Sequence, residues 1–221
     1  MKKALLVSIA LVVMYVVGTF AAGTTVNGTR VINGDLTVKG TCTGCGSAVG
    51  LVGPLDTVNV SGQSALTMSA AACFTSSTYD NIILKLTYAV PGTSGDNLYL
   101  RFNGDTGTNY TWSGFRNSNS GSAISGAVAT NQILLDTNGT VGTNALGWTG
   151  TIEIFGIGSG KQQHVQYEGG YLDPSPAPIN TNGHGFYLST TAITSVTFEY
   201  ANAGTVHTIS GTAKCYGVAK S

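Results

Sequence analysis

Residues 82–102 read IILKLTYAVPGTSGDNLYLRF, and this stretch decides the fold class. Its first part, 82–90, is rich in Ile, Leu, Thr, Tyr and Val, and its last part, 97–102, alternates apolar and polar positions. Successive side chains of a strand point to opposite faces, so the Leu and Phe residues of the last part share one face. Such runs are β-prone, and the Pro, Gly and Asp residues between them favour a turn. The stretch therefore predicts two strands of an all-β protein.

Similar runs recur along the chain. They are 133–136 (ILLD), 151–157 (TIEIFGI), 164–167, 185–189 (GFYLS), 195–200 (SVTFEY) and 205–218. After Gly23 no long segment has the 3.6-residue apolar period of an amphipathic helix, although 64–73 fits one short helix. Together the runs make about eight strands, which predicts an antiparallel jelly-roll-like β-sandwich.

The turn signals are dense. Gly accounts for 31 of the 221 residues, and the dipeptide Asn-Gly begins at Asn27, Asn33, Asn103, Asn138 and Asn182. Both residues of Asn-Gly tolerate the positive φ angles of a type I′ turn, whose twist matches that of paired strands. We therefore predict hairpin turns at these positions.

The first 22 residues have the order of a secretory signal. Lys2 and Lys3 precede the apolar run 4–17, and small residues follow at 18–22. A cationic start, an apolar stretch and a small-residue cleavage zone define such signals. Residues 4–22 also approach the length of about 20 that spans a bilayer, so an uncleaved membrane anchor stays open. Both interpretations export the rest of the chain to a virion, the extracellular space or the cell surface, because the Lys pair stays inside.

A β-repeat precedes the main domain. Residues 24–41 read TTVNGTRVINGDLTVKGT, in which apolar residues alternate with polar ones around Asn-Gly and Lys-Gly. One strand-turn-strand unit cannot bury its apolar face alone, since an isolated hairpin is marginal in water. It needs a partner, either the main domain or the same segment of other chains, and we expect a homo-oligomer with a trimer favoured. The side chains expected to be buried there are Val26, Val31, Ile32, Leu36 and Val38.

These features divide the chain into three parts. Residues 1–22 are the signal peptide or membrane anchor. Residues 23–50 are an attachment and oligomerisation segment that ends in a hinge of Gly, Thr and Ser around a Cys-Thr-Gly-Cys motif. Residues 51–221 are the β-sandwich domain.

The charge balance excludes a large class of partners. The chain has 10 basic and 10 acidic side chains, and charged residues make up only 9% of it. A nucleic-acid binder needs a basic face, and no excess of Lys or Arg supplies one. So few charges are unusual for a lone soluble domain and fit a surface that packs against copies of itself.

The chain has four cysteines, Cys42, Cys45, Cys73 and Cys215. In an exported chain an even number indicates disulfides, here with three pairings open. Cys42 and Cys45 also have the spacing of a zinc knuckle or a redox pair. A zinc site needs two more ligands, and the other cysteines do not form a second such motif. We therefore expect disulfides, and no metal or other cofactor.

No motif fixes a catalytic chemistry. His164, His184 and His207 lie far apart and form no HxH or HExxH zinc motif. Many of the acidic residues fall at expected turns, where aspartates cap backbone donors, so a glycosidase pair of carboxylates is not indicated. The oxygen-rich stretch 103–109 lacks the terminal Glu of a calcium loop and is expected to be a hairpin turn. We predict that the protein is not an enzyme.

Four aromatic residues are candidates for glycan contacts: Tyr110, Trp112, Phe115 and Trp148. A sugar ring needs an apolar face to stack on and hydrogen-bonding groups around it. The competing interpretation places these residues in the core, because aromatic residues are favoured in strands that pack on a half-buried surface. Both interpretations stay open.

Several phrases resemble known proteins. INGDLTVKGT (32–41) resembles the shaft or attachment repeats of tailed-phage fibres and other virion appendages. DNLYLRFNGDTGTNYTW (96–112) and SVTFEYANAGTVHTISGTAKCYGVAK (195–220) resemble stretches of small phage structural proteins of β-sandwich type. GTIEIFGI (150–157) is similar to their middle strand. An export signal is not typical of that group.

The resemblance implies a non-enzymatic virion or phage-derived surface structural protein. Its β-sandwich head would decorate a particle or attach to a host surface, with virion proteins or a cell-surface glycan as partners. The resemblance fixes no catalytic, cofactor or metal position. The alternative is a secreted or membrane-anchored bacterial adhesin or carbohydrate-binding module, and a secreted hydrolase has the least support.

Overall fold

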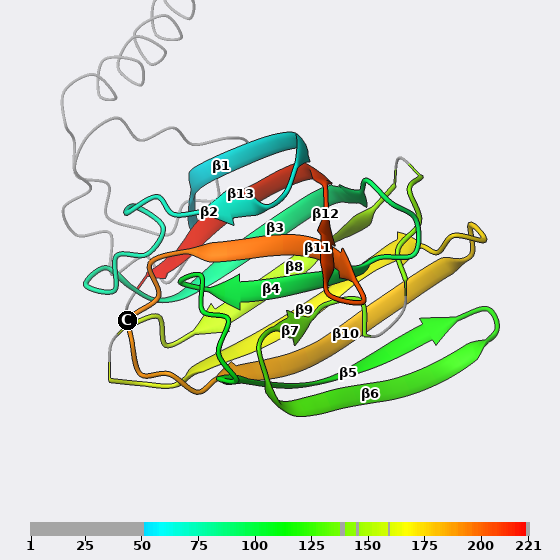
Figure 1. Cartoon of the computed structure of the whole chain (residues 1–221). Helices are drawn as coiled ribbons and strands as arrows, with labels where there is room; N and C mark the ends of the chain where they lie inside the picture. Colours follow the sequence, from blue (N-terminus) through cyan, green and yellow to red (C-terminus); the bar gives the residue numbers. More distant parts are fainter. Residues whose placement is uncertain (1–50, 138–139, 145, 159, 220–221) are drawn as a thin grey trace, which may run out of the picture. The chain divides into compact units, whose positions relative to one another are not determined.

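The computed structural model describes residues 51–137, 140–144, 146–158 and 160–219, which lie within the unit Cys45–Ser221. Within this part the chain folds into two antiparallel β-sheets and has no helix (Figure 1). The predicted all-β class is confirmed. The expected signal or anchor helix and the β-repeat lie outside the described residues.

The larger sheet has eight strands. In spatial order they are β1 (Leu51–Gln63), β13 (Ile209–Ala219), β3 (Tyr79–Pro91), β8 (Trp148–Phe155), β9 (Gln163–Leu172), β10 (Pro178–Tyr187), β5 (Tyr110–Ser118) and β6 (Gly121–Thr130). The edges of this sheet are therefore β1 and β6.

The smaller sheet has five strands. Four lie in the order β12 (Thr205–His207), β11 (Val196–Asn202), β4 (Asn97–Phe102) and β7 (Ile133–Leu134), and β2 (Leu66–Met68) also pairs with β11. Figure 1 shows β11 and β4 in front of the larger sheet, with the core between the two layers.

The core follows the alternation of the strands. In β3 every second residue from Ile82 to Leu86 is fully buried, and in β11 Phe198 is fully buried as well. A hydrogen bond also joins the two sheets, because the Tyr200 hydroxyl on β11 donates to the carbonyl oxygen of Ala89 on β3. Large apolar side chains from both layers thus form one contiguous core.

Aromatic rings cover the inner face where β9 and β10 extend the larger sheet. Trp148 lies against Gly169, where a Cβ atom would come within 2.3 Å of the indole ring. Tyr167 lies against Gly183, where a Cβ atom would come within 2.4 Å of the phenol oxygen. The turn predicted at Asn182 is therefore wrong. Asn182 and Gly183 lie inside β10, and the glycine serves close packing.

The turn predicted at Asn103 is confirmed in its backbone geometry. Asn103 and Gly104 have φ angles of 54° and 65°. The Asp105 amide donates to the Phe102 carbonyl oxygen at 2.8 Å. The turn does not close a hairpin, however, because β4 and β5 belong to different sheets. The dipeptides at Asn27, Asn33 and Asn138 lie outside the described residues.

Two further predictions about the strands need correction. The short helix expected over 64–73 is wrong, because β2 lies there and both of its apolar residues, Leu66 and Met68, are buried against β11. The single strand expected over 205–218 is two strands, β12 and β13, which lie in different sheets. The strands β1, β2, β5 and β6 have no counterpart among the predicted runs.

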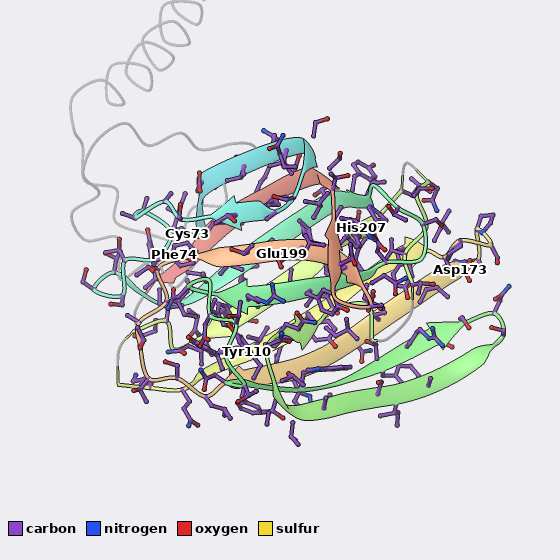
Figure 2. All side chains as sticks on the ribbon, in the orientation of Figure 1. Cys73, Phe74, Tyr110, Asp173, Glu199 and His207 are labelled. Atoms are coloured by element: carbon purple, nitrogen blue, oxygen red, sulfur yellow. A yellow bond between two sulfur atoms is a disulfide. The ribbon has the colours of Figure 1, made fainter. Side chains whose placement is uncertain are left out.

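One disulfide joins the turn after β2 to the larger sheet. Cys73, labelled in Figure 2, pairs with Cys215 on β13, and both residues are fully buried. The bridge closes a sequence separation of 142 residues, and bridges of this kind stabilise a fold by roughly 2–5 kcal/mol. The other two cysteines, Cys42 and Cys45, lie outside the described residues.

Candidate functional site

Three of the four aromatic candidates for glycan contacts are buried. Tyr110, labelled in Figure 2, and Trp148 are fully buried, and Trp112 is 9% exposed. The indole nitrogen of Trp148 donates to the Thr181 hydroxyl at 3.2 Å, so its polar group is satisfied inside the fold. Phe115 is 37% exposed and lies at the surface. The placements favour the core interpretation for the three buried residues.

The three histidines do not form one site. His207, labelled in Figure 2, lies on β12, with its Nδ1 atom 2.8 Å from a carboxylate oxygen of the buried Asp96. His164 and His184 are neighbours on β9 and β10, with ring centroids 6.2 Å apart. Among the described residues, no group of three or more His, Cys, Asp or Glu side chains is arranged to hold a metal ion.

Asp105 organises the oxygen-rich loop 103–109. Its carboxylate accepts hydrogen bonds from the Asn109 amide at 2.8 Å, the Gly107 backbone amide at 2.7 Å and the Tyr187 hydroxyl at 2.8 Å. These bonds, that of Asn109 foremost, hold the pKa of Asp105 below its ordinary value. The carboxylate therefore caps the loop and is not directed at a ligand.

The residues expected to mediate oligomerisation, Val31, Ile32, Leu36 and Val38, lie outside the described residues. Within the described part of the chain there is no helix of the length and apolar character needed to cross a membrane.

A polar hollow lies over β8, β9 and β10, on the face of the larger sheet that points away from the core. It has a volume of about 340 Å³, and the side chains that line it include Thr151, Glu153, Gln166, Glu168, Asn182 and His184. Residues that alternate with these, such as Ile152 and Val165, are fully buried, so the lining side chains project outward. We call this feature the central hollow.

The strand register arranges the central hollow in two rows. Glu153, Gln166 and His184 lie opposite one another across the three strands. Thr151, Glu168 and Asn182 form the neighbouring row. Directly opposite side chains have Cβ atoms about 5 Å apart, so the two rows form one continuous patch of carboxylate, amide, hydroxyl and imidazole groups.

The carboxylates of the central hollow have no partner within the described chain. Glu153 and Glu168 form no hydrogen bond or ion pair there, and neither do the side-chain amides of Gln166 and Asn182. The other described carboxylates all have partners in the fold: Asp56, Asp80, Asp96, Asp105, Asp136, Asp173 and Glu199. The unused hydrogen-bonding capacity of the described acidic residues is thus concentrated at one place.

Stacked rings border the central hollow. Phe155, His164 and Phe186 lie opposite one another on β8, β9 and β10, with successive ring centroids 5.4 Å and 4.7 Å apart. The ring planes differ by only 21° and 17°, so the rings stack face to face. Burial, and secondarily the neighbouring His184, holds the pKa of His164 below its ordinary value, which keeps this imidazole neutral at pH 7. The border is therefore apolar and uncharged.

A second hollow adjoins the first at His184. It has a volume of about 440 Å³, lies over β10, β5 and β6, and is lined by Thr111, Trp112, Ser113, Val128, His184 and Phe186 among others. Because β10 lies between β9 and β5, Phe186 stacks on His164 on one side and faces this hollow on the other. We call it the apolar hollow. Together the two hollows form a strip suited to an elongated ligand with polar groups and an apolar face.

Sequence reasoning missed this strip for a definable reason. The alternation within 151–157 separates a polar face from an apolar one and so indicates which way Thr151 and Glu153 point. It does not indicate that β9 and β10 lie beside that strand, because only 164–167 and 185–189 were predicted as strands there and a turn was predicted at Asn182, inside β10. The signal that was present is the outward Glu, Gln and Asn positions of the individual strands.

Comparisons of this chain with protein-family models, curated proteins and solved structures found no match.

Proposed function

We propose that this chain is a non-enzymatic structural protein of a virion, or of a phage-derived surface assembly, whose head decorates a particle or attaches it to a host surface. The strand order of the two sheets is the observation that carries the proposal. Because one fold serves many functions, the strand order alone is not sufficient, and the surface of the head and the N-terminal sequence must also support the proposal.

The strand order supports a jelly roll, the two-sheet architecture found in viral capsid and lectin domains. When the hairpins β5–β6 and β9–β10 and the short β12 are set aside, the remaining strands pair first with last and second with next to last. The pairs are β1 with β13, β2 with β11, β3 with β8, and β4 with β7. A single long hairpin rolled into two sheets has this pairing.

The edge strand β6 supports a role within an assembly. Its sequence, GSAISGAVAT, has no charged residue and no proline, and Ile124 and Val128 are each 80% exposed. Soluble proteins protect a sheet edge with charge, proline or short length, because an open edge pairs with other chains. A neighbouring copy of this chain that pairs with β6 would cover this open edge.

The N-terminal sequence supports export and oligomerisation. The β-repeat over 24–41 cannot bury its own apolar face, and a homotrimer would bury it against identical segments. Residues 4–22 would either be cleaved or hold the assembly at a membrane until it is released. The mature protein would then lie in a virion or at an extracellular surface.

Fractionation of particles from cultures that produce the chain tests the proposal. We expect the chain to sediment with particles in a density gradient and to be present in many copies per particle by quantitative mass spectrometry. A chain recovered only from particle-free fractions would contradict a structural role in a particle. Light scattering on the full-length chain provides the matched measurement, with about three times the chain mass expected for a trimer.

The second candidate is a secreted or membrane-anchored adhesin or carbohydrate-binding module. The central hollow favours it, since the described chain leaves the polar groups there without partners. A stable monomer by light scattering, absent from particles, would select this candidate over the first.

A further inference from the structure

We infer that the central hollow and the apolar hollow together form one binding site for a neutral oligosaccharide. This ligand class belongs to the host-attachment role proposed above and rests on it. The two hollows meet at His184, so one ligand can occupy both.

The polar side chains of the central hollow match the chemistry of sugar hydroxyls. A hydroxyl group both donates and accepts a hydrogen bond. Glu153 and Glu168 accept from hydroxyls in charge-assisted bonds, which are about twice as strong as neutral ones. Gln166 and Asn182 each offer a donor and an acceptor. Because these groups have no hydrogen-bonding partners in the described chain, binding a sugar breaks no internal hydrogen bond of theirs.

The charges around the site select a neutral sugar. Among the residues that the structure describes, no Lys or Arg side chain lines the central hollow, so an acidic sugar would face the two carboxylates without a counter-charge. The nearest cation in the strand register is Lys85, which lies opposite Thr151 on β3. Its ammonium group lies over the ring of Tyr216 on β13, 5.5 Å from the centroid. β13 pairs with the edge of β3 opposite to β8, so this ammonium group is directed away from the central hollow.

The apolar hollow supplies the stacking surface. Phe186 is 38% exposed and Val128 is 80% exposed, and both line it. The apolar face of a sugar ring can rest on such side chains while its hydroxyls reach His184 and Ser113. The aromatic residues of the core, such as Trp148, supply no such surface because they are buried.

The length of the strip indicates an oligosaccharide and not a single sugar. From β8 to β6 the sheet crosses β9, β10 and β5. Neighbouring strands lie about 4.8 Å apart, so this distance is about 19 Å, the span of several sugar units. Each hollow separately has the volume of a small-molecule site.

Titration calorimetry with the purified full-length chain in mild detergent tests the site. The probes are short neutral oligomers of hexose and of N-acetylhexosamine, and a hexuronate oligomer of equal length as the acidic comparator. We expect at least one neutral oligomer to bind about tenfold or more tightly than the acidic one. Glu168→Gln, and separately Phe186→Ala, should weaken that binding about tenfold. Asp56→Asn is the matched control, because it removes a carboxylate from β1 of the same sheet, and it should leave binding unchanged.

Each other outcome overturns the inference. Absence of binding to every neutral oligomer rejects the ligand class, and unchanged binding by both site variants rejects the location. Self-association that Glu168→Gln or Phe186→Ala abolishes would show that a second copy covers this face. If the oligosaccharide inference fails, the proposed role in a particle is not affected, because sedimentation with particles tests that role separately. Conversely, glycan binding by a chain that never sediments with particles rejects the virion role while the site stands.

Discussion

β3 and β6 are long strands of the same antiparallel sheet, yet their side chains have opposite surroundings. β3 pairs on both sides, with β13 and β8, and its buried positions alternate with more exposed ones. Within the described part of the chain β6 pairs only with β5, and none of its side chains is buried. The two strands therefore separate two properties that usually occur together, backbone pairing and core burial.

The difference shows how β6 is held in place. Its partner β5 is anchored by Tyr110 and Trp112, which are buried in the core. The ladder from Tyr110 to Ser118 then positions β6 through backbone hydrogen bonds. Small side chains on β6 contribute little burial to the fold. Stability should accordingly depend on strands such as β3 and β11, and binding or assembly on β6 and its outer face.

Removal of a core side chain should give the largest effect. Phe198 on β11 is fully buried between the sheets, and Phe198→Ala should lower the free energy of unfolding by about 3–5 kcal/mol through lost burial and a cavity. Val128→Ala on β6 is the matched truncation at an exposed position and should change it by less than about 0.5 kcal/mol. Urea unfolding of the full-length chain measures both. Similar losses for the two variants would refute the division between the strands.

The same division decided what the sequence could predict. The bounds 97–102 predicted for β4 agree with the structure, because large apolar residues alternate there with polar ones. β6 has Gly, Ser and Ala at most positions, so it shows no apolar period, and no strand was predicted. In β9 and β10 only the segments rich in large side chains were predicted. Gly169 and Gly183, which make room for aromatic rings, interrupt the pattern in the rest.

The candidate site was less predictable than the fold. Outward positions can be assigned within one strand from its alternation, but the central hollow needs three strands in a defined register. β8, β9 and β10 are consecutive in the chain, but only parts of β9 and β10 were predicted as strands, so the sequence did not define their register. The aromatic residues chosen from the sequence were conspicuous because they are large, and Trp148 and Tyr110 are buried for the same reason.

Alkaline pH should lower the free energy of unfolding by an intermediate amount, and the effect should come from strands whose tyrosines are buried. Burial raises the pKa of Tyr167 to about 12, and it also raises the pKa of Tyr110, Tyr171 and Tyr200. In the unfolded chain these phenols ionise near pH 10, while in the folded chain they stay protonated to higher pH. The stability is therefore fully present below about pH 10 and is lost as the pH rises through the folded-state values. Tyr167 alone should account for about 2–3 kcal/mol of that loss.

Unfolding measured by near-ultraviolet circular dichroism from pH 8 to pH 12 follows this loss. Tyr167→Phe removes the titrating group, so it should flatten the decline while it leaves the decline due to the other tyrosines. A decline of equal steepness in Tyr167→Phe would show that the buried phenol does not control the alkaline transition.

The smallest effect on stability, and the largest on assembly, is expected at the edge strand. Ile124→Lys combined with Val128→Lys places two charges on β6, where the wild-type side chains are exposed, and should change the free energy of unfolding by less than about 0.5 kcal/mol. The same charges repel a second copy that approaches along β6, since charged edge strands resist pairing. The double variant should therefore stay folded but sediment less with particles.

Val206→Lys on β12, where Val206 is 46% exposed, is the matched control and should sediment as the wild type does. If the β6 variant assembles normally, the open edge is tolerated by its twist or its small side chains, and the contacts between copies must come from the N-terminal segment instead.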